Sequence, residues 1–196
     1  MKGIIIYKGK YGATRQYAAW LRDELGLQLV QADHCKSYHI ELSDIIVIGT
    51  SIYVGKMQVS KWLKKNLDIL KKKKVFLFVV CGTAMDETQK LESYLDASMP
   101  AELRHHCSTY FLPGRLVYKK LSSWDKFMLR MGAMLSKDPV VKEKMMTDYD
   151  SVKKECLSQL LADVKKVNPV EEPACCSKDD SHRLQLGDRA LISSYP

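Results

Sequence analysis

A chain of 196 residues is long enough to form one domain with a substantial core, and it is short for two. Hydrophobic residues make up 46% and charged residues 28%, a balance that excludes a largely disordered chain, and the net charge of +8 suits an anionic partner. The chain has no apolar run as long as a membrane span and no signal-peptide pattern at its start. We therefore expect a cytoplasmic protein that is at most peripheral to the inner face of the cell membrane.

The chain opens with an apolar run, residues 3–7, that predicts a strand. A short Gly-containing loop follows, and then apolar residues recur at helical spacing. Such a loop directs backbone N–H groups and the positive end of a helix dipole toward one point, which favours a bound phosphate. The alternative is a plain tight turn whose lysines face water. The residues of this first loop are Lys8, Gly9, Lys10, Tyr11, Gly12, Ala13 and Thr14.

Strand and helix signals alternate along the rest of the chain. Residues 27–30 indicate an edge strand, residues 45–48 and 75–80 are continuous apolar runs typical of strands buried on both faces, and residues 108–112 predict a fifth strand. Helical faces are marked at residues 14–25, 59–70, 91–95 and 152–164. Five strands alternating with helices predict a doubly wound α/β fold with a parallel sheet, and the order 2-1-3-4-5 is a common way to wind it.

That strand order also predicts where a ligand binds. In open α/β sheets, ligands sit beyond the carboxyl ends of the strands at the point where the strand order reverses, which here lies between strands 1 and 3. Three loops meet there: residues 8–14, 50–57 and 81–87. Each begins where an apolar strand stops, and each contains Gly or small hydroxyl residues.

An additional amphipathic helix is predicted between the fifth strand and the last helix. Its apolar face comprises Leu121, Trp124, Phe127, Met128, Met131, Met134 and Leu135, and Lys119, Lys120, Lys126, Arg130 and Lys137 lie around the other side. Because the five-stranded sheet is complete without this helix, two interpretations stay open. The helix either packs into the core, or it presents a surface to lipid or to a flat hydrophobic substrate.

At this point the sequence resembles a known family. The segments 12–14, 49–55 and 81–83 resemble the three FMN-contacting loops of flavodoxins. Residues 114–118 and 124–128, together with the Lys142-Glu143 pair and residues 147–149, are similar to the insert region of HemG-type menaquinone-dependent protoporphyrinogen oxidases, also called protoporphyrinogen IX dehydrogenases. The resemblance spans about residues 3–165.

The resemblance implies a flavodoxin-like fold that carries FMN, with the phosphate in the first loop and the ring between the second and third. It further implies an FMN-dependent oxidoreductase of heme biosynthesis, which removes hydrogen from protoporphyrinogen and uses a quinone or a similar acceptor; the flavin does the chemistry, so no acid–base triad is required. Besides the first loop, the implied cofactor-binding residues are Thr50, Ser51, Ile52, Tyr53, Val54, Gly55, Cys81, Gly82, Thr83 and Ala84. Arg115, Tyr118, Trp124, Phe127, Met128 and Met131 are implied to form a substrate or membrane surface.

Aromatic cover of the flavin ring is expected from one loop only. Tyr53 in the second loop is a candidate to stack on a ring face, with a surface tyrosine covering the next helix as the alternative. The third loop has no aromatic residue, so the other ring face is left to Met85, to the insert or to solvent.

Two other classes of function stay open. The first is a flavodoxin-like electron carrier without a substrate of its own, but such carriers are usually acidic and this chain carries +8. The second is a non-catalytic basic module that binds nucleic acid or an anionic membrane, and it predicts a colourless protein with salt-sensitive binding. We do not favour nucleic acid as a partner. A hydrophobic small molecule or quinone, with peripheral membrane contact through the insert helix, is the expected set of partners.

The predicted domain organisation is an FMN-binding domain over residues 1–167, with an insert at about 114–146, and a polar, weakly structured tail over 168–196. From Glu171 onward the tail carries −2, so the rest carries +10. Cysteines and histidines lack metal-ligand spacing, so no metal site is predicted. The adjacent Cys175 and Cys176 are interpreted as incidental to the tail, with a redox or lipidation site as the alternative.

Overall fold

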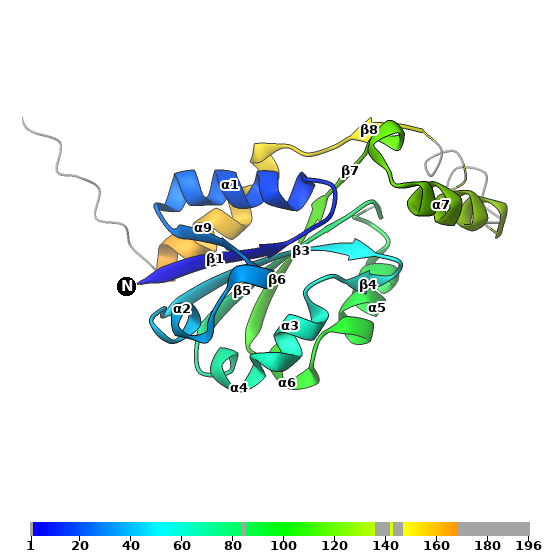
Figure 1. The fold of residues 1–196 in the computed structure, drawn as a ribbon. Coiled ribbons are helices and arrows are strands. Elements are labelled where there is room, and N and C mark those ends of the chain that lie inside the picture. Colours follow the sequence, from blue (N-terminus) through cyan, green and yellow to red (C-terminus); the bar gives the residue numbers. More distant parts are fainter. Residues whose placement is uncertain (1, 84, 136–141, 143–146, 168–196) are drawn as a thin grey trace, which may run out of the picture.

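The computed structural model describes residues 2–83, 85–135, 142 and 147–167. Within these residues the main sheet has five parallel strands in the order β2-β1-β3-β5-β6 (Figure 1). The strands are β1 (Gly3–Lys8), β2 (Gln28–Gln31), β3 (Ile45–Tyr53), β5 (Lys74–Cys81) and β6 (Cys107–Pro113). Since β4 (Lys56–Met57) only pairs antiparallel with β3, this is the order 2-1-3-4-5 expected of a flavodoxin-like fold, and the predicted fold class is confirmed.

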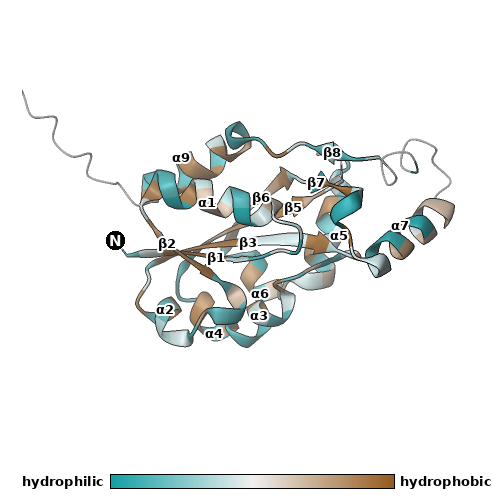
Figure 2. Cartoon of the chain, turned by 45° about the horizontal axis from the view of Figure 1, so that its top comes forward, coloured by the Kyte–Doolittle hydropathy of each residue, from teal (hydrophilic) through white to brown (hydrophobic). Residues whose placement is uncertain are grey.

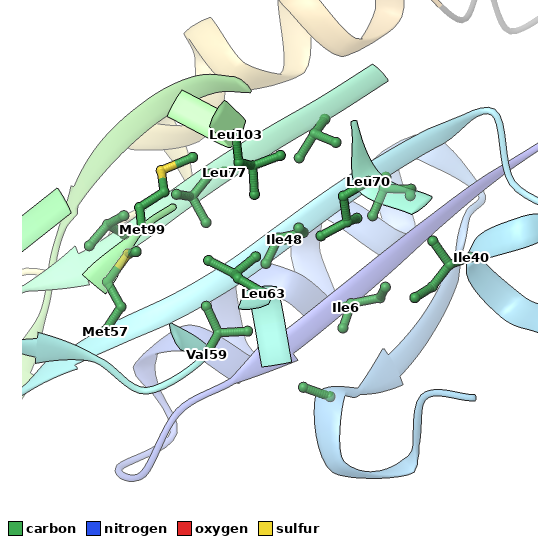
Figure 3. Close-up of a cluster of buried hydrophobic side chains, with 14 of the residues drawn as sticks. Ile6, Ile40, Ile48, Met57, Val59, Leu63, Leu70, Leu77, Met99 and Leu103 are labelled. Carbon is green, nitrogen blue, oxygen red and sulfur yellow. The ribbon is translucent and has the colours of Figure 1, made fainter. Parts of the chain in front are cut away.

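Helices cover both faces of the sheet (Figure 1). One face packs against α1 (Ala13–Leu25) and α9 (Ser158–Val167), and the other packs against α2 (Ser37–Glu41), α3 (Ser60–Lys65), α4 (Leu67–Leu70), α5 (Thr88–Ser98) and α6 (Ala101–Arg104). Successive residues of β1 point to opposite faces, so that Ile5 joins the first cluster while Ile4 and Ile6 join the second. Hydrophobic residues follow the central strands in Figure 2, and Figure 3 shows the second cluster between β1, β3, β5 and the helices.

Two predicted helices differ from the observed ones. The face expected over residues 59–70 belongs to two short helices, because the chain breaks at Asn66, whose side-chain amide donates to the Trp62 carbonyl at 2.8 Å. The last helix begins with a tight turn, η3 (Lys154–Leu157), and continues as α9; Val152 therefore precedes it. The sequence reading also missed η1 (Ala32–His34), α2 and α6, which are too short to show a clear period.

The second loop is shorter than predicted. Residues 50–53 were expected to lie in a loop, but they continue β3, which turns directly into a hairpin with β4. The turn residues Val54 and Gly55 have φ of 48° and 71°, and this left-handed pair matches the twist of a two-residue hairpin. The second loop is therefore a rigid hairpin whose tip is Val54-Gly55.

The insert forms a unit of its own beyond the carboxyl ends of the strands (Figure 1). It runs from Gly114 through β7 (Arg115–Leu116), η2 (Tyr118–Lys120) and α7 (Ser123–Leu135) to β8 (Tyr149–Asp150). The two short strands pair antiparallel, with Leu116 opposite Tyr149. We call residues 114–150 the insert region, because this pairing closes it four residues later than predicted. Lys137, residues 143–146 and the tail with Cys175 and Cys176 lie outside the described residues.

Candidate functional site

A cavity of about 320 Å³ opens where the central strands end, and its size lies within the range of ligand pockets, about 300–1,000 Å³. The three predicted loops meet there, and the insert region completes it. The loops contribute Tyr11, Ala13 and Thr14, then Ser51, Ile52, Tyr53, Val54 and Gln58, then Val80, Cys81 and Gly82. The insert region contributes Gly114, Arg115, Leu116, Leu121, Asp125, Met128, Leu129 and Tyr149.

Most of the predicted cofactor-binding residues meet at this cavity, and several do not. Lys8, Gly9, Lys10, Gly12, Thr50, Gly55 and Thr83 are not among its lining residues, and Ala84 lies outside the described part of the chain. Of the predicted substrate or membrane residues, Arg115 and Met128 line the cavity, whereas Tyr118, Trp124, Phe127 and Met131 do not. Sequence reasoning missed Gln58, Val80, Gly114, Leu116, Leu121, Asp125, Leu129 and Tyr149. The helical spacing of Leu121, Asp125 and Leu129 was a usable signal for three of them.

The first loop presents the start of α1 to the cavity. Ala13 and Thr14, the first residues of the helix, line the cavity, and Thr14 is otherwise buried against the domain. No acidic residue lies in the first turn, so the positive end of this thirteen-residue helix is not neutralised by its own sequence. This end of the cavity therefore suits an anionic group, as the sequence predicted.

The two lysines of the first loop have protein partners. The Lys8 ammonium pairs with Asp33 at 2.5 Å, on the surface. The Lys10 ammonium donates to Asp125 Oδ2 at 2.7 Å and to the Tyr53 hydroxyl at 3.2 Å. A phosphate contact from either lysine stays a prediction, and it would require the lysine to exchange these partners. The cavity offers Ala13 and Thr14, at the start of α1, for the same task.

Lys10, Tyr53 and Asp125 form a cluster that joins two loops to α7. The Tyr53 hydroxyl donates to Asp125 Oδ1 at 2.5 Å, and the Lys10 ammonium lies 4.3 Å from the centre of the Tyr53 ring. Asp125 is only 5% exposed, so its charge needs these partners. The hydrogen bond from Lys10 to Asp125 is the largest cause of the raised pKa of Lys10. The Lys10–Asp125–Tyr53 cluster thus holds α7 over the first and second loops.

The insert region is also attached to the third loop. The Gly114 N–H donates to the Cys81 carbonyl at 2.8 Å, and the Ser151 N–H donates to the Gly114 carbonyl at 3.1 Å. Arg115 pairs with Asp150 at 3.4 Å through one terminal nitrogen, while its Nε is buried without a hydrogen-bond partner. The insert region therefore reaches all three loops through hydrogen bonds.

The apolar face of α7 is divided between the cavity and the surface. Leu121 just before the helix and Met128 within it lie at the cavity. The other large apolar side chains of this face are exposed to solvent, unlike core residues: Trp124 62%, Phe127 51%, Met131 40%, Met134 76% and Leu135 78%. The Trp124 and Phe127 rings contact each other with centroids 5.7 Å apart. Of the two interpretations of this helix, exposed surface describes most of its apolar residues. We call these five residues the α7 apolar patch.

The cavity fits the FMN implied by the resemblance. Two buried polar atoms among its lining residues, the Tyr11 hydroxyl and Arg115 Nε, have no protein partner, and a bound group with acceptors would satisfy them. The start of α1 and Thr14 would hold the phosphate, and the aromatic and apolar side chains of Tyr53 and Ile52 would contact the ring. The flavin, when bound, supplies the redox chemistry.

Among the described residues, none of the helices combines the length and the hydrophobicity needed to cross a membrane. The same part of the chain contains no group of three or more His, Cys, Asp or Glu side chains that could hold a metal ion.

The chain is similar to known proteins. A family model described as a flavodoxin domain matches residues 4–141. Among solved structures, a flavodoxin from the domain Archaea is 16% identical with a TM-score of 0.42, and the alignment covers 75% of this chain and 100% of that one. The two-electron reduced flavodoxin of Megasphaera elsdenii is 18% identical with a TM-score of 0.45, covering 56% and 82%. Oxidised flavodoxin 2 from Bacillus cereus is 15% identical with a TM-score of 0.42, covering 84% and 99%.

The match to the flavodoxin domain model shows which family the chain belongs to. No curated protein matches the chain. The matched segment, residues 4–141, is more than half of the chain and includes the three loops and α7. The chain belongs to the flavodoxin domain family, and this membership indicates an FMN-binding electron-transfer protein.

Proposed function

We propose that this protein is an FMN-dependent oxidoreductase of the protoporphyrinogen-oxidising type, which takes hydrogen from a flat hydrophobic substrate and delivers the electrons to a quinone or a similar acceptor. The observation that carries the proposal is the insert region, which adds eight residues to the cavity and leaves an apolar helix face exposed. A carrier that only exchanges electrons needs no additional wall of residues for a substrate, and the exposed apolar patch marks an interaction site. The insert region is therefore the feature that a substrate explains.

The insert side of the cavity suits a flat hydrophobic molecule. Leu116, Leu121, Met128 and Leu129 line it with aliphatic and thioether groups, and flexible methionine adapts to an irregular apolar surface. Arg115 adds a planar cation with donor capacity left over after its single ion pair with Asp150. Guanidinium groups bind carboxylates well, and a porphyrinogen carries propionate carboxylates. These residues bind and orient the substrate, and none of them takes part in the chemical step.

The α7 apolar patch supports peripheral membrane contact, where a hydrophobic quinone is dissolved. Its exposed aromatic residues, Trp124 and Phe127, are types that favour the lipid–water interface. Lys119 and Lys120 are exposed immediately before the helix, and Arg130 lies exposed on it, which suits anionic lipid headgroups. The acceptor would then approach from the lipid side of α7, and the substrate would occupy the cavity on the other side.

Turnover by the FMN-loaded protein tests the reaction. Under anaerobic conditions we expect protoporphyrinogen and a soluble menaquinone analogue to give fluorescent porphyrin at a rate proportional to protein. Deleting residues 119–137 should abolish porphyrin formation and leave FMN bound, because the three loops remain. Undiminished turnover in the deletion variant would contradict the proposal. Wild-type protein that binds FMN, forms no porphyrin and only passes electrons between partner proteins would identify an electron carrier.

Co-sedimentation with vesicles tests the membrane surface. We expect the protein to bind vesicles containing phosphatidylglycerol at low salt, and high salt should weaken this binding. Replacing Trp124 and Phe127 by Ser should reduce it strongly. Leu42→Ser is the matched control, since Leu42 is 64% exposed but belongs to the other end of the molecule, after α2. Equal binding by the double variant would exclude the α7 apolar patch as the contact.

A further inference from the structure

The third loop supplies no aromatic side chain of its own to the cavity, but an aromatic residue from the insert region lies over it. Val80, Cys81 and Gly82 are the lining residues of this loop, and all are aliphatic or small. Tyr149, the first residue of β8, lines the same cavity and is only partly exposed. Tyr149 thus provides, beside the third loop, the aromatic side chain that this loop lacks.

The Tyr149 hydroxyl occupies the space that a side chain on Gly82 would need. A Cβ atom built on Gly82 would lie 2.2 Å from the Tyr149 hydroxyl, far inside the 3.0 Å that real Cβ contacts respect, and 3.5 Å from the ring carbon that bears this hydroxyl. Gly82 is not one of the glycines with a left-handed backbone, which are Gly12, Gly26 and Gly55. Backbone conformation therefore does not require a glycine here, whereas a larger residue would have to displace the Tyr149 hydroxyl.

Backbone hydrogen bonds hold Tyr149 in this position. It pairs with Leu116 across the β7–β8 ladder, and β7 begins next to Gly114, whose N–H binds the Cys81 carbonyl. The Ser151 N–H then returns to the Gly114 carbonyl. The tyrosine is therefore anchored from both strands of the insert region to the end of β5. Burial raises the pKa of its hydroxyl.

We propose that Tyr149 is the aromatic side of the FMN site at the third loop, as Tyr53 is at the second, and that its contact with Gly82 fixes how closely the flavin ring can approach. Tyr149 is a positioning residue that does not react. The inference rests on FMN binding and not on the porphyrinogen substrate. Stacking of an aromatic ring contributes enough for about a tenfold effect on affinity, equivalent to about 1.4 kcal/mol.

Titration of the apoprotein with FMN, followed by flavin fluorescence, tests the stacking. We expect Tyr149→Phe to keep wild-type affinity and quenching, because the ring remains. Tyr149→Ala should raise the FMN Kd about tenfold and leave the bound flavin more fluorescent. Tyr38→Ala, at an exposed tyrosine outside the cavity, should change neither quantity. Wild-type affinity and quenching in a folded Tyr149→Ala variant would overturn the proposal.

The close contact offers a second, independent test. Gly82→Ala should weaken FMN binding, because the new methyl group displaces Tyr149. In the double variant Gly82→Ala/Tyr149→Phe the offending hydroxyl is gone and the ring carbon at 3.5 Å is an ordinary contact, so affinity should recover. Failure of the recovery, with thermal unfolding showing both apoproteins folded, would contradict the role of Tyr149. Since these readouts use only FMN, a protein that binds FMN but oxidises no substrate leaves this inference intact while refuting the proposed function.

Discussion

The two sides of the cavity are built in different ways. On one side, the lining residues lie at or just beyond the ends of β1, β3 and β5, the central strands of the sheet, whose apolar residues Ile5, Val47 and Phe78 are fully buried. On the other side, the insert region hangs beyond the sheet and exposes the α7 apolar patch. The sheet side is therefore fixed by the core of the domain, whereas the insert side depends on a few polar contacts.

This difference suggests that the residues on the two sides of the cavity have different roles. Residues on the sheet side, such as Thr14 and Tyr53, occupy the loops that a flavodoxin fold brings together at the end of its sheet. Residues on the insert side, such as Arg115 and Met128, line the cavity from outside that sheet, and in the proposed function they contact the substrate. Changes in the sheet should therefore affect folding as a whole, while changes in the insert region should affect the site with little effect on folding.

A Phe→Ala substitution on each side should give the largest difference in stability. Phe78 is fully buried in β5, and its ring fills the space where Gly49 would carry a Cβ. Phe78→Ala should lower the free energy of unfolding by about 3–5 kcal/mol, because it leaves a large cavity. Phe127→Ala, at a side chain that is 51% exposed in α7, should change it by less than about 0.5 kcal/mol. Urea denaturation measures both, and comparable losses would show that α7 is part of the folding core.

Breaking the polar contacts that attach α7 should have an intermediate effect on stability. Asp125→Ala removes the carboxylate shared by Lys10 and Tyr53, and we expect a loss of about 1–2 kcal/mol, less than for a fully buried pair because Lys10 is partly exposed. Amide hydrogen exchange should accelerate in residues 123–135 and stay slow in β3 and β5. Asp125→Asn keeps the shape of the side chain and one acceptor, so its free energy of unfolding should lie between those of the wild type and Asp125→Ala. Unchanged exchange in α7 after Asp125→Ala would rule out the cluster as its attachment.

Most of the sheet side could be predicted from the sequence, and most of the insert side could not. Continuous apolar runs such as residues 75–80 identify buried parallel strands, and strand order then brings three loops together. The helical spacing of Asp125 could place it beside Leu121 and Leu129, but it could not show that Lys10 and Tyr53 are its partners. Tyr149 gave no such signal, because its role comes from a contact with Gly82, far away in the chain. The hairpin at Val54-Gly55 was missed for a related reason: β3 keeps pairing beyond its apolar part. Periodicity reports burial in the core, and it does not report which polar groups meet over a cavity.

A smaller effect is expected at Tyr17, where the sheet side and the insert region are joined. Its buried hydroxyl donates to the Pro113 carbonyl at 2.9 Å and accepts from the Lys153 N–H at 3.4 Å, at the two points where the chain leaves the sheet and returns. Tyr17→Phe should cost about 1 kcal/mol at neutral pH. Urea denaturation of both proteins measures this difference.

The pH dependence of that difference separates the hydroxyl from the ring. Burial raises the pKa of Tyr17 from 10.0 to about 12, so the unfolded chain loses this proton near pH 10 while the folded protein still holds it. The stabilisation is complete below pH 10 and falls as the pH rises toward 12. Tyr17→Phe has no such group, and the stability gap between the two proteins should narrow over this range. A constant gap would mean that the hydroxyl is not held in a desolvated position, and the junction between sheet and insert region would then depend on packing alone.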